Sequence, residues 1–256
     1  MKAEKREKVK VYGRPRLKND LPLAYCPGCH YGIITSLIAE VIEEMGIEGN
    51  TIGVSSVGCT FVTTQYFDLD FIDSAHGRSP AVATGLKHAL FGKPIVFTMQ
   101  GDGDLAAIGM GCIINAINRF EKITTIFLNN ANYGTTGGQL APTTLLGQKT
   151  TTTPNGRDPE SAGFPIHIAE FLTNLKGVAY SARCAVNTPA NYNRAKKALK
   201  IAFQKQIDGV GYSIVEFLSA CPGSWRLTPA AATKRIAEEM IPEYPLGEFK
   251  NVESIT

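Results

Sequence analysis

The stretch Ile95–Asp104, with the sequence IVFTMQGDGD, decides the fold that we expect for this chain. Its first half, Ile95–Met99, is a short apolar run typical of a buried strand. The run ends in Gly101–Asp104, after which the apolar pattern predicts a helix over Leu105–Phe120 and a strand over Thr124–Leu128. A strand, a turn, a helix and a strand in this order predict two parallel strands joined by a right-handed crossover.

The same alternation of helix and strand continues on both sides of this unit. Further helices are expected over Ile33–Met45, Ser79–Leu90, Ile166–Leu175 and Pro189–Gln206, and further strands over Thr51–Val54, Val178–Ser181 and Ser213–Phe217. This pattern predicts an α/β fold with a doubly wound, mainly parallel sheet. We expect a basic N-terminal arm over residues 1–24, one domain over 25–225, and a C-terminal helix and tail over 226–256. No internal repeat is visible.

The composition is that of an ordinary soluble enzyme, with 44% hydrophobic and 19% charged residues in a chain of 256. The net charge of +3 is too small to predict a nucleic-acid partner. The basic residues of the arm, which we interpret as a solvated or partner-docking extension, are Lys2, Lys5, Arg6, Lys8, Lys10, Arg14, Arg16 and Lys18. Because neither a secretory signal nor a membrane-spanning stretch is visible, we expect a cytoplasmic protein with no membrane partner.

Gly101–Asp104 lies where a strand is expected to end and a helix to begin, which is where open parallel sheets bind ligands. The glycines let the backbone approach a phosphate, and the helix N-terminus favours negative charge. A carboxylate at Asp102 would repel a bare diphosphate, so its presence indicates an intervening divalent cation, for which Mg²⁺ is suited. The tetrapeptide alone is weak evidence, because such turns occur in many loops.

A second motif, Asn129–Asn130, follows the next expected strand and places Asn130 28 residues after Asp102. Because adjacent parallel strands end at the same edge of a sheet, the two motifs are expected to face each other. The alternative is that Asp102 caps a helix and the asparagines form a turn. The pairing resembles the thiamine-diphosphate signature, which implies that the Asp102 carboxylate, the Asn130 side chain and the Asn132 main-chain carbonyl hold Mg²⁺.

Two further stretches resemble the 2-oxoacid:ferredoxin oxidoreductases: Tyr133–Gln139, YGTTGGQ, and Ala75–Arg78, AHGR, with the AVATG that follows it. For His76 and Gly77 an exposed turn is the alternative. The resemblance implies a thiamine-diphosphate-binding fold, with Thr135 as the catalytic residue. The residues that it implies for cofactor binding are Gly58, Cys59, Thr60, Phe61, His76, Gly77, Gly101, Gly103, Asp104, Asn130, Gly134 and Thr135.

Six cysteines in a chain without a secretory signal indicate metal binding or catalysis rather than disulfides. Cys26 and Cys29 are spaced as a metal or a cluster requires, and Cys59 and Cys221 each follow an expected strand. Spacing alone leaves zinc and a [4Fe–4S] cluster open; the cysteine pattern of the family carries over to these four residues and implies the cluster. The remaining two, Cys112 and Cys184, are interpreted as buried small hydrophobic residues.

The resemblance implies a beta-type subunit for the coenzyme A-dependent oxidative decarboxylation of a 2-oxoacid, with electrons passed to ferredoxin. The 3-methyl-2-oxobutanoate type is favoured; 2-oxoglutarate and pyruvate are the alternatives, since His30 and Gly223–Trp225 depart from the common family pattern. The expected partners are an alpha-type pyrimidine-domain subunit that supplies the activating glutamate, and gamma and ferredoxin-like delta subunits. Two rival interpretations are a non-redox thiamine-dependent decarboxylase or synthase subunit and a zinc-stapled interaction subunit.

Overall fold

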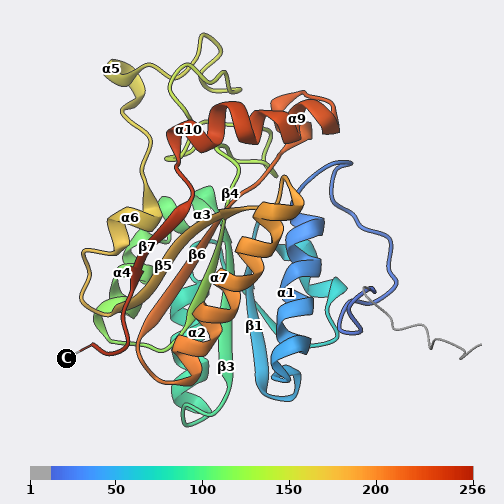
Figure 1. Ribbon diagram of the computed structural model, residues 1–256. Helices are drawn as coiled ribbons and strands as arrows, with labels where there is room; N and C mark the ends of the chain where they lie inside the picture. Colours follow the sequence, from blue (N-terminus) through green and yellow to red (C-terminus); the bar gives the residue numbers. More distant parts are fainter. Residues whose placement is uncertain (1–12, 256) are drawn as a thin grey trace, which may run out of the picture.

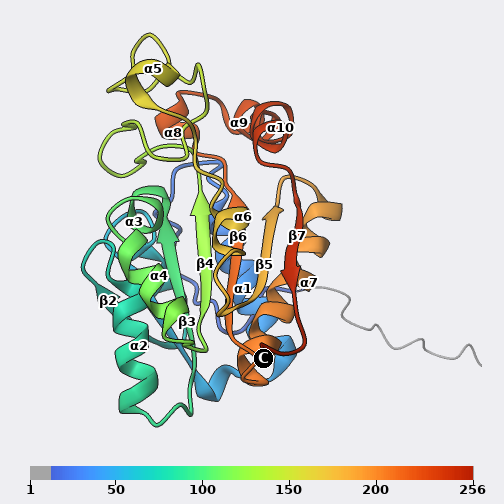
Figure 2. The ribbon, with the colours of Figure 1, turned by 90° about the vertical axis from the view of Figure 1, so that its left-hand side faces the viewer.

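The central feature of the structure, a computed structural model that describes residues 13–255, is a seven-stranded sheet with the order β2-β1-β3-β4-β6-β5-β7. Every strand pair is parallel except β5 with β7. The strands are β1 Thr51–Ser56, β2 Asp70–Ser74, β3 Ile95–Gly101, β4 Thr124–Asn129, β5 Val178–Ala185, β6 Tyr212–Leu218 and β7 Gly247–Asn251. The expected doubly wound, mainly parallel fold is confirmed (Figures 1 and 2).

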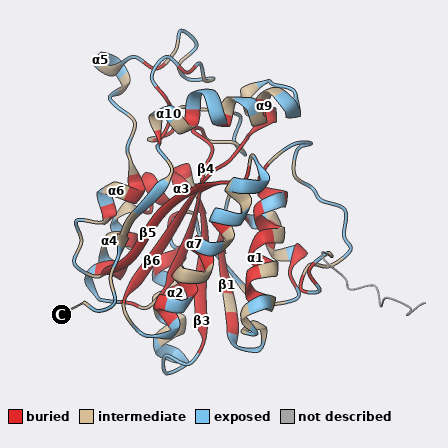
Figure 3. Cartoon of the chain, viewed as in Figure 1, coloured by how far each residue is buried: buried red, intermediate tan, exposed pale blue. Residues whose placement is uncertain are grey.

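Helices cover both faces of the sheet. One face packs against α1 (Tyr31–Met45) and α7 (Pro189–Ile207), and the other against α2 (Ser79–Ala89), α4 (Met110–Asn118) and α6 (Ile168–Leu172). Neighbouring residues of one strand alternate between the two cores: Phe97 packs with α1 and α7, whereas Val96 packs with α2 and α4. Burial on both faces explains the nearly continuous apolar runs of β3 and β4 (Figure 3). None of the helices within residues 13–255 combines the length and apolar character of a membrane span.

The expected single helix over Leu105–Phe120 is wrong. The chain forms a short α3, Asp102–Ala106, then breaks and restarts as α4. At the break, a Cβ atom on Gly109 would lie 2.0 Å from the main-chain oxygen of Asp104, a position that no side chain can occupy. The break therefore lets the backbone of Gly109 pack directly on the turn that carries Asp104.

The terminal segments pack on the domain. Within the described part of the N-terminal arm, Leu17 is buried and Asn19 donates its N–H to the Tyr66 carbonyl at 3.0 Å. The arm residues Lys2, Lys5, Arg6, Lys8 and Lys10 lie outside the described residues. At the other end, α9 (Pro229–Arg235), a π-helical turn (Ile236–Met240) and α10 (Ile241–Glu243) are followed by β7, which joins the sheet and which the sequence analysis missed.

The long segment between β4 and α6 folds over the carboxyl edge of the sheet, beside α9 and α10 (Figure 1). It contains the short helix α5, Pro159–Ala162, and is organised by the buried side chain of Arg157. The Arg157 guanidinium donates to a ring of main-chain carbonyls: those of Ala141, Pro142, Thr144, Ala162, Gly163 and Phe164. One side chain thus fixes the path of a loop whose sequence shows little periodicity. This loop covers the carboxyl ends of the strands.

Candidate functional site

The turns after β3 and β4 meet at the carboxyl edge of the sheet. The strand register pairs Gly101 with Leu128, which brings Asp102 beside Asn130. The carboxylate of Asp102 accepts the N–H of Asn130 at 3.0 Å and the N–H of Ala131 at 3.2 Å. Ala131 has a positive φ of 55°, so the chain turns sharply and directs its amide groups at the carboxylate. The two sequence motifs therefore face each other, as expected from parallel strands.

Three oxygen atoms converge at this turn. The side-chain oxygen of Asn130 lies 2.8 Å from Oδ2 of Asp102 and 2.7 Å from the main-chain oxygen of Asn132. Turning the amide over would replace both contacts by hydrogen bonds, whereas a cation would satisfy all three oxygens together. Adjacent ligands of an octahedral Mg²⁺ at about 2.0–2.1 Å lie roughly 2.8–3.0 Å apart, so the donor set and its spacing fit this ion.

The pKa of the Asp102 carboxyl also favours a cation at this turn. Burial raises the pKa of the Asp102 carboxyl to about 7, although hydrogen bonds from the Thr143 hydroxyl and from the amides of Asn130 and Ala131 lower it. Taking a carboxylate out of water disfavours its charged form, and a nearby cation reverses this preference. A divalent cation beside Asp102 would therefore stabilise the charged form of this buried carboxyl.

A cavity of about 250 Å³ lies against this turn. Most of the residues expected to bind the cofactor line it: Gly58, Cys59, Thr60, His76, Gly101, Gly103, Asp104, Asn130, Gly134 and Thr135, together with Asp102 and Asn132. Gly77 does not line the cavity, but it donates its N–H to Asp104, which does. Phe61 is exposed and does not line this cavity, so the structure does not place it with the others.

Asp104 is held by several donors. The Ser56 hydroxyl and the Gly77 amide donate to its Oδ1, and the His76 ring lies 3.4 Å from the same atom. Burial raises the pKa of Asp104, while these hydrogen bonds and His76 lower it. Its Oδ2 is buried and has no partner within residues 13–255, as is also true of Oδ1 of Asn132. Both atoms are unsatisfied polar groups at the edge where the sequence predicts a ligand.

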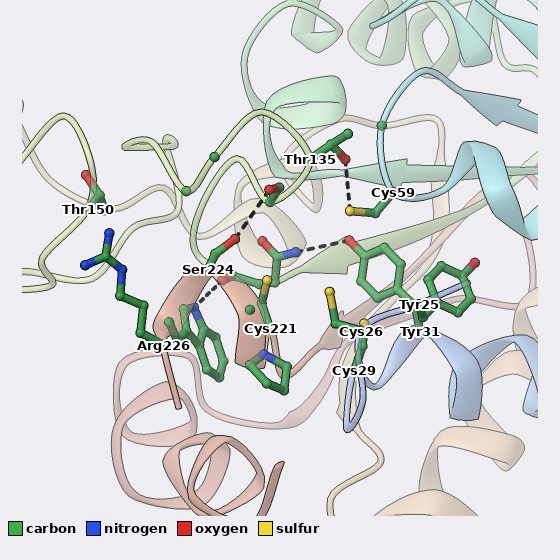
Figure 4. A pocket seen from close by; sticks show the side chains of 18 of the residues that line it. Tyr25, Cys26, Cys29, Tyr31, Cys59, Thr135, Thr150, Cys221, Ser224 and Arg226 are labelled. Carbon is green, nitrogen blue, oxygen red and sulfur yellow. Dashed lines mark hydrogen bonds between the residues drawn. The ribbon is translucent and has the colours of Figure 1, made fainter. Parts of the chain in front are cut away.

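A second and larger cavity, of about 950 Å³, is lined by Cys26, Cys29, Cys59 and Cys221 (Figure 4). They come from three segments: the loop before α1, the loop after β1, and the turn after β6. Burial raises the pKa of Cys29 to about 12; the Tyr31 amide opposes this shift, and the negative charges of Cys221, Cys59 and Cys26 add to it. The other three thiols are thus near enough to affect the ionisation of Cys29.

The thiols surround the cavity rather than meeting at a point. Within residues 13–255, no three His, Cys, Asp or Glu side chains are grouped closely enough to hold a metal ion. A structural zinc site needs four ligands within about 2.0–2.3 Å of one ion. This arrangement does not match a preformed zinc site; a polynuclear cluster, by contrast, has the size to contact thiols on several walls of a cavity. Cys184 is buried elsewhere, in β5, as expected. Cys112 is only half-buried, on α4 beside Arg78, so the interpretation of Cys112 as a buried residue is wrong.

The two cavities share a wall. The residues that line both are Tyr31, Gly58, Cys59, Asn130, Gly134 and Thr135. Sequence reasoning missed Tyr31, whose hydroxyl lies 3.3 Å from both the Leu128 carbonyl and the Asn130 side-chain nitrogen. It also missed Trp225, whose indole N–H donates to the Asn130 carbonyl at 3.1 Å. Their positions two and three residues after the CxxC and Cys–Pro motifs were the available signal.

Comparison with known proteins shows the family of the chain. Residues 52–217 match the family model described as thiamine pyrophosphate enzyme, C-terminal TPP binding domain. The 2-oxoglutarate synthase subunit KorB of Archaeoglobus fulgidus is 37% identical over 220 residues, which cover 85% of this chain and 77% of the relative. The chain belongs to the thiamine-pyrophosphate-binding subunits of the 2-oxoacid oxidoreductases. The family predicted from the sequence is confirmed.

Other members of this oxidoreductase family are also similar. The ketoisovalerate oxidoreductase subunit VorA of Methanothermobacter marburgensis is 45% identical over 232 residues, 91% of this chain. The chain spans only 48% of that relative's length. A solved structure of the 2-oxoglutarate:ferredoxin oxidoreductase from Magnetococcus marinus, with 2-oxoglutarate, coenzyme A and succinyl-CoA bound, aligns with a TM-score of 0.76 and 25% identity. The alignment covers 96% of this chain and 87% of that one.

Proposed function

We propose that this oxidoreductase subunit binds thiamine diphosphate through Mg²⁺ and also carries a [4Fe–4S] cluster. The proposal assigns Mg²⁺ to the side chains of Asp102 and Asn130 and to the Asn132 carbonyl. The convergence of these three oxygens at cation-ligand spacing supports it. The diphosphate would lie against Gly103, Asp104, Gly134 and Thr135, which line the smaller cavity. Gly58, Thr60, His76, Gly77 and Gly101 complete the proposed cofactor contacts.

The redox assignment rests on the wall that the two cavities share. Cys26, Cys29, Cys59 and Cys221 are proposed to hold the cluster, and Cys59 lines both cavities. Four thiolates, here from three loops, are the ligand set of a [4Fe–4S] cluster. A non-redox thiamine enzyme has no need for such a centre beside its cofactor, so the adjacency favours an oxidoreductase over a simple decarboxylase or synthase.

When bound, thiamine diphosphate supplies an electron sink for decarboxylation of a 2-oxoacid. The residues of this chain would orient the cofactor and exclude water. Ser56 and Gly77 fix the Asp104 carboxylate, and Trp225 holds the Asn130 carbonyl. Thr135, the proposed catalytic residue, presents its hydroxyl on the wall between the two cavities.

A partner subunit is part of the proposal. The smaller cavity, at about 250 Å³, is below the roughly 300–1,000 Å³ of a complete ligand pocket. Asp102 and Asp104 are the carboxylates among its described lining residues, and both are already assigned to metal and diphosphate. An alpha-type pyrimidine-domain subunit would supply the activating glutamate and close the site, with gamma and ferredoxin-like delta subunits completing the complex.

For the substrate we propose a branched-chain 2-oxoacid, 3-methyl-2-oxobutanoate, with coenzyme A as acyl acceptor and ferredoxin as electron acceptor. The 45% identity to a ketoisovalerate oxidoreductase subunit supports this choice over 2-oxoglutarate, since the 2-oxoglutarate synthase subunit of Archaeoglobus fulgidus is 37% identical. Assays of the complex with its partner subunit and a viologen dye, over a panel of branched-chain 2-oxoacids, 2-oxoglutarate and pyruvate, test it. A preference for 2-oxoglutarate or pyruvate would contradict the assignment.

The cluster is tested on the chain itself. Anaerobic purification followed by iron, sulfide and zinc analysis should give about four irons per chain and a broad absorption band in the visible region. A colourless protein that binds thiamine diphosphate would instead indicate the non-redox enzyme. Stoichiometric zinc without cofactor would indicate an interaction subunit stapled by the four cysteines.

A further inference from the structure

Thr135 joins the two cavities through one hydrogen bond. Its Oγ1 lies 2.9 Å from Sγ of Cys59, and both residues line the wall that the cavities share (Figure 4). Thr135 belongs to the turn after β4 that also carries Asn130, whereas Cys59 belongs to the loop after β1. The contact therefore links the loop of the cation-site residues to the loop of a thiol.

The direction of this hydrogen bond follows from chemistry. Between a free thiol and a hydroxyl either atom could donate, but a cysteine that ligates iron is a thiolate and has no proton to give. The Thr135 hydroxyl must then donate to the sulfur. Within residues 13–255, Thr135 is the one side chain with a hydrogen bond to any of the four thiols that line the larger cavity. The Tyr31 amide is a main-chain donor to Cys29.

We infer that Thr135 sets the reduction potential of the iron–sulfur centre through its hydrogen bond to Cys59. The inference rests on the proposed cluster. Reduction adds negative charge to the cluster and its sulfurs, and a donor aimed at one of these sulfurs stabilises the reduced state more than the oxidised state. The hydroxyl therefore raises the potential, at the thiol nearest the cofactor cavity.

This role differs from that of a residue that only shapes the cavity. A structural role would depend on the volume of the side chain, and Val has nearly the same shape as Thr without the hydroxyl. A role in setting the potential depends on the donor alone, and Ser keeps it. The two substitutions Thr135→Val and Thr135→Ser therefore separate the explanations.

The test is an anaerobic redox titration of the cluster by electron paramagnetic resonance, in wild type and in the variants. Thr135→Val should lower the midpoint potential by about 59 mV, a tenfold change in a one-electron equilibrium. Thr135→Ser should keep the wild-type potential. Thr136→Val is the matched control, because the Thr136 hydroxyl donates to the Gln139 side chain at 2.7 Å and makes no contact with sulfur in the described structure.

The outcomes separate a failure of the proposed function from a failure of this inference. A wild-type chain that carries no cluster overturns both this inference and the proposed function. An intact cluster whose potential is the same in Thr135→Val as in wild type overturns the inference alone. If Thr135→Val does not assemble a cluster, Thr135→Ala replaces it, and its potential must again fall below that of Thr135→Ser. An equal shift in Thr136→Val would also contradict the assignment to this hydroxyl.

Discussion

Arg183 donates to Glu216 at 2.9 Å, and both side chains are completely buried. The same glutamate accepts a hydrogen bond from the side chain of Asn129 at 2.7 Å and one from the Ala169 amide at 3.3 Å. Asn129 is the last residue of β4 and immediately precedes Asn130 of the cation site. The buried ion pair on β5 and β6 therefore supports the strand end from which the candidate site begins.

Replacing Arg183 by Met should strongly destabilise the protein. The change leaves Glu216 buried without a counter-charge, and removal of one partner of such a pair costs about 3–5 kcal/mol. The double variant Arg183→Met/Glu216→Gln should lose less, because neutral Gln can still accept from Asn129. Chemical denaturation measures both free energies of unfolding. A double variant as unstable as the single one would show that packing, rather than the orphaned charge, sets the loss.

The second carboxylate on Arg183 should make stability depend on pH. Burial raises the pKa of Glu170, but its hydrogen bonds and ion pair with Arg183 outweigh burial and hold the pKa below the usual 4.5. A depressed pKa in the folded state stabilises the protein above the unfolded-state pKa, and this contribution is lost as the pH falls through the folded value.

Glu170→Gln should therefore lower the free energy of unfolding relative to wild type at neutral pH, with the difference shrinking below pH 4.5. Urea denaturation at several pH values measures this difference. Glu160→Gln, at an exposed position of α5, is the control and should change the free energy of unfolding little. A gap between wild type and Glu170→Gln that stays constant down to low pH would contradict the role of the ion pair.

The fold could be predicted where burial leaves a pattern in the sequence. β3 and β4 are covered on both faces and contain the apolar runs IVF and IFL, so their position and direction were clear. β2 and β7 are edge strands with polar residues, DFIDS and GEFKN, and nothing in those letters distinguishes them from loops. These two segments form strands because the neighbouring strands offer main-chain hydrogen bonds. The break after Ala106 likewise depends on a close backbone contact that sequence periodicity does not record.

The residues of the candidate site also divide into those that the sequence predicts and those that it does not. Asp102 and Asn130 could be paired because both follow adjacent parallel strands, and that geometry needs only strand order. Two other residues lie in a loop whose path is determined by tertiary contacts. Thr143 donates to Asp102, and Arg157 donates to the main-chain carbonyls of that loop. No local pattern identifies them. Sequence reasoning therefore found the residues at strand ends and in recognisable motifs, and missed the two that lie farther along the loop.

The cation site predicts how the cofactor stabilises the chain. If Asp102 ligates Mg²⁺, the ion and thiamine diphosphate together should raise the melting temperature more than either does alone. At a ligand concentration a hundredfold above Kd, this gain corresponds to about 2.7 kcal/mol. Asp102→Asn should lose most of it, because the amide carries no charge. The control Asp158→Asn changes an exposed carboxylate that caps α5 and should keep the gain. Equal gains in both variants would contradict the proposed ligand.

Gly109 and Gly111, two residues apart, should respond oppositely to alanine. A methyl group at Gly109 would overlap the Asp104 carbonyl, which belongs to the backbone and cannot move aside without shifting the site. Gly109→Ala should cost about 1–3 kcal/mol. A methyl group at Gly111 meets nothing within 4 Å, and Gly111→Ala should stabilise α4 by roughly 0.5 kcal/mol. Thermal unfolding of both variants measures the contrast, and similar melting temperatures would contradict the close contact.

The six cysteines should divide into two groups when each is replaced by serine. Cys26, Cys29, Cys59 and Cys221 line one cavity, so each of these variants should lose most of its iron and visible absorbance. Cys112 and Cys184 lie outside that cavity, and their variants should keep about four irons per chain. Cys184→Ser also tests burial, since it places a hydroxyl among apolar residues and should lower stability without changing the iron content. Iron loss in the Cys112 or Cys184 variant, with full retention in one of the other four, would mean that the cluster is held by a different set of thiols.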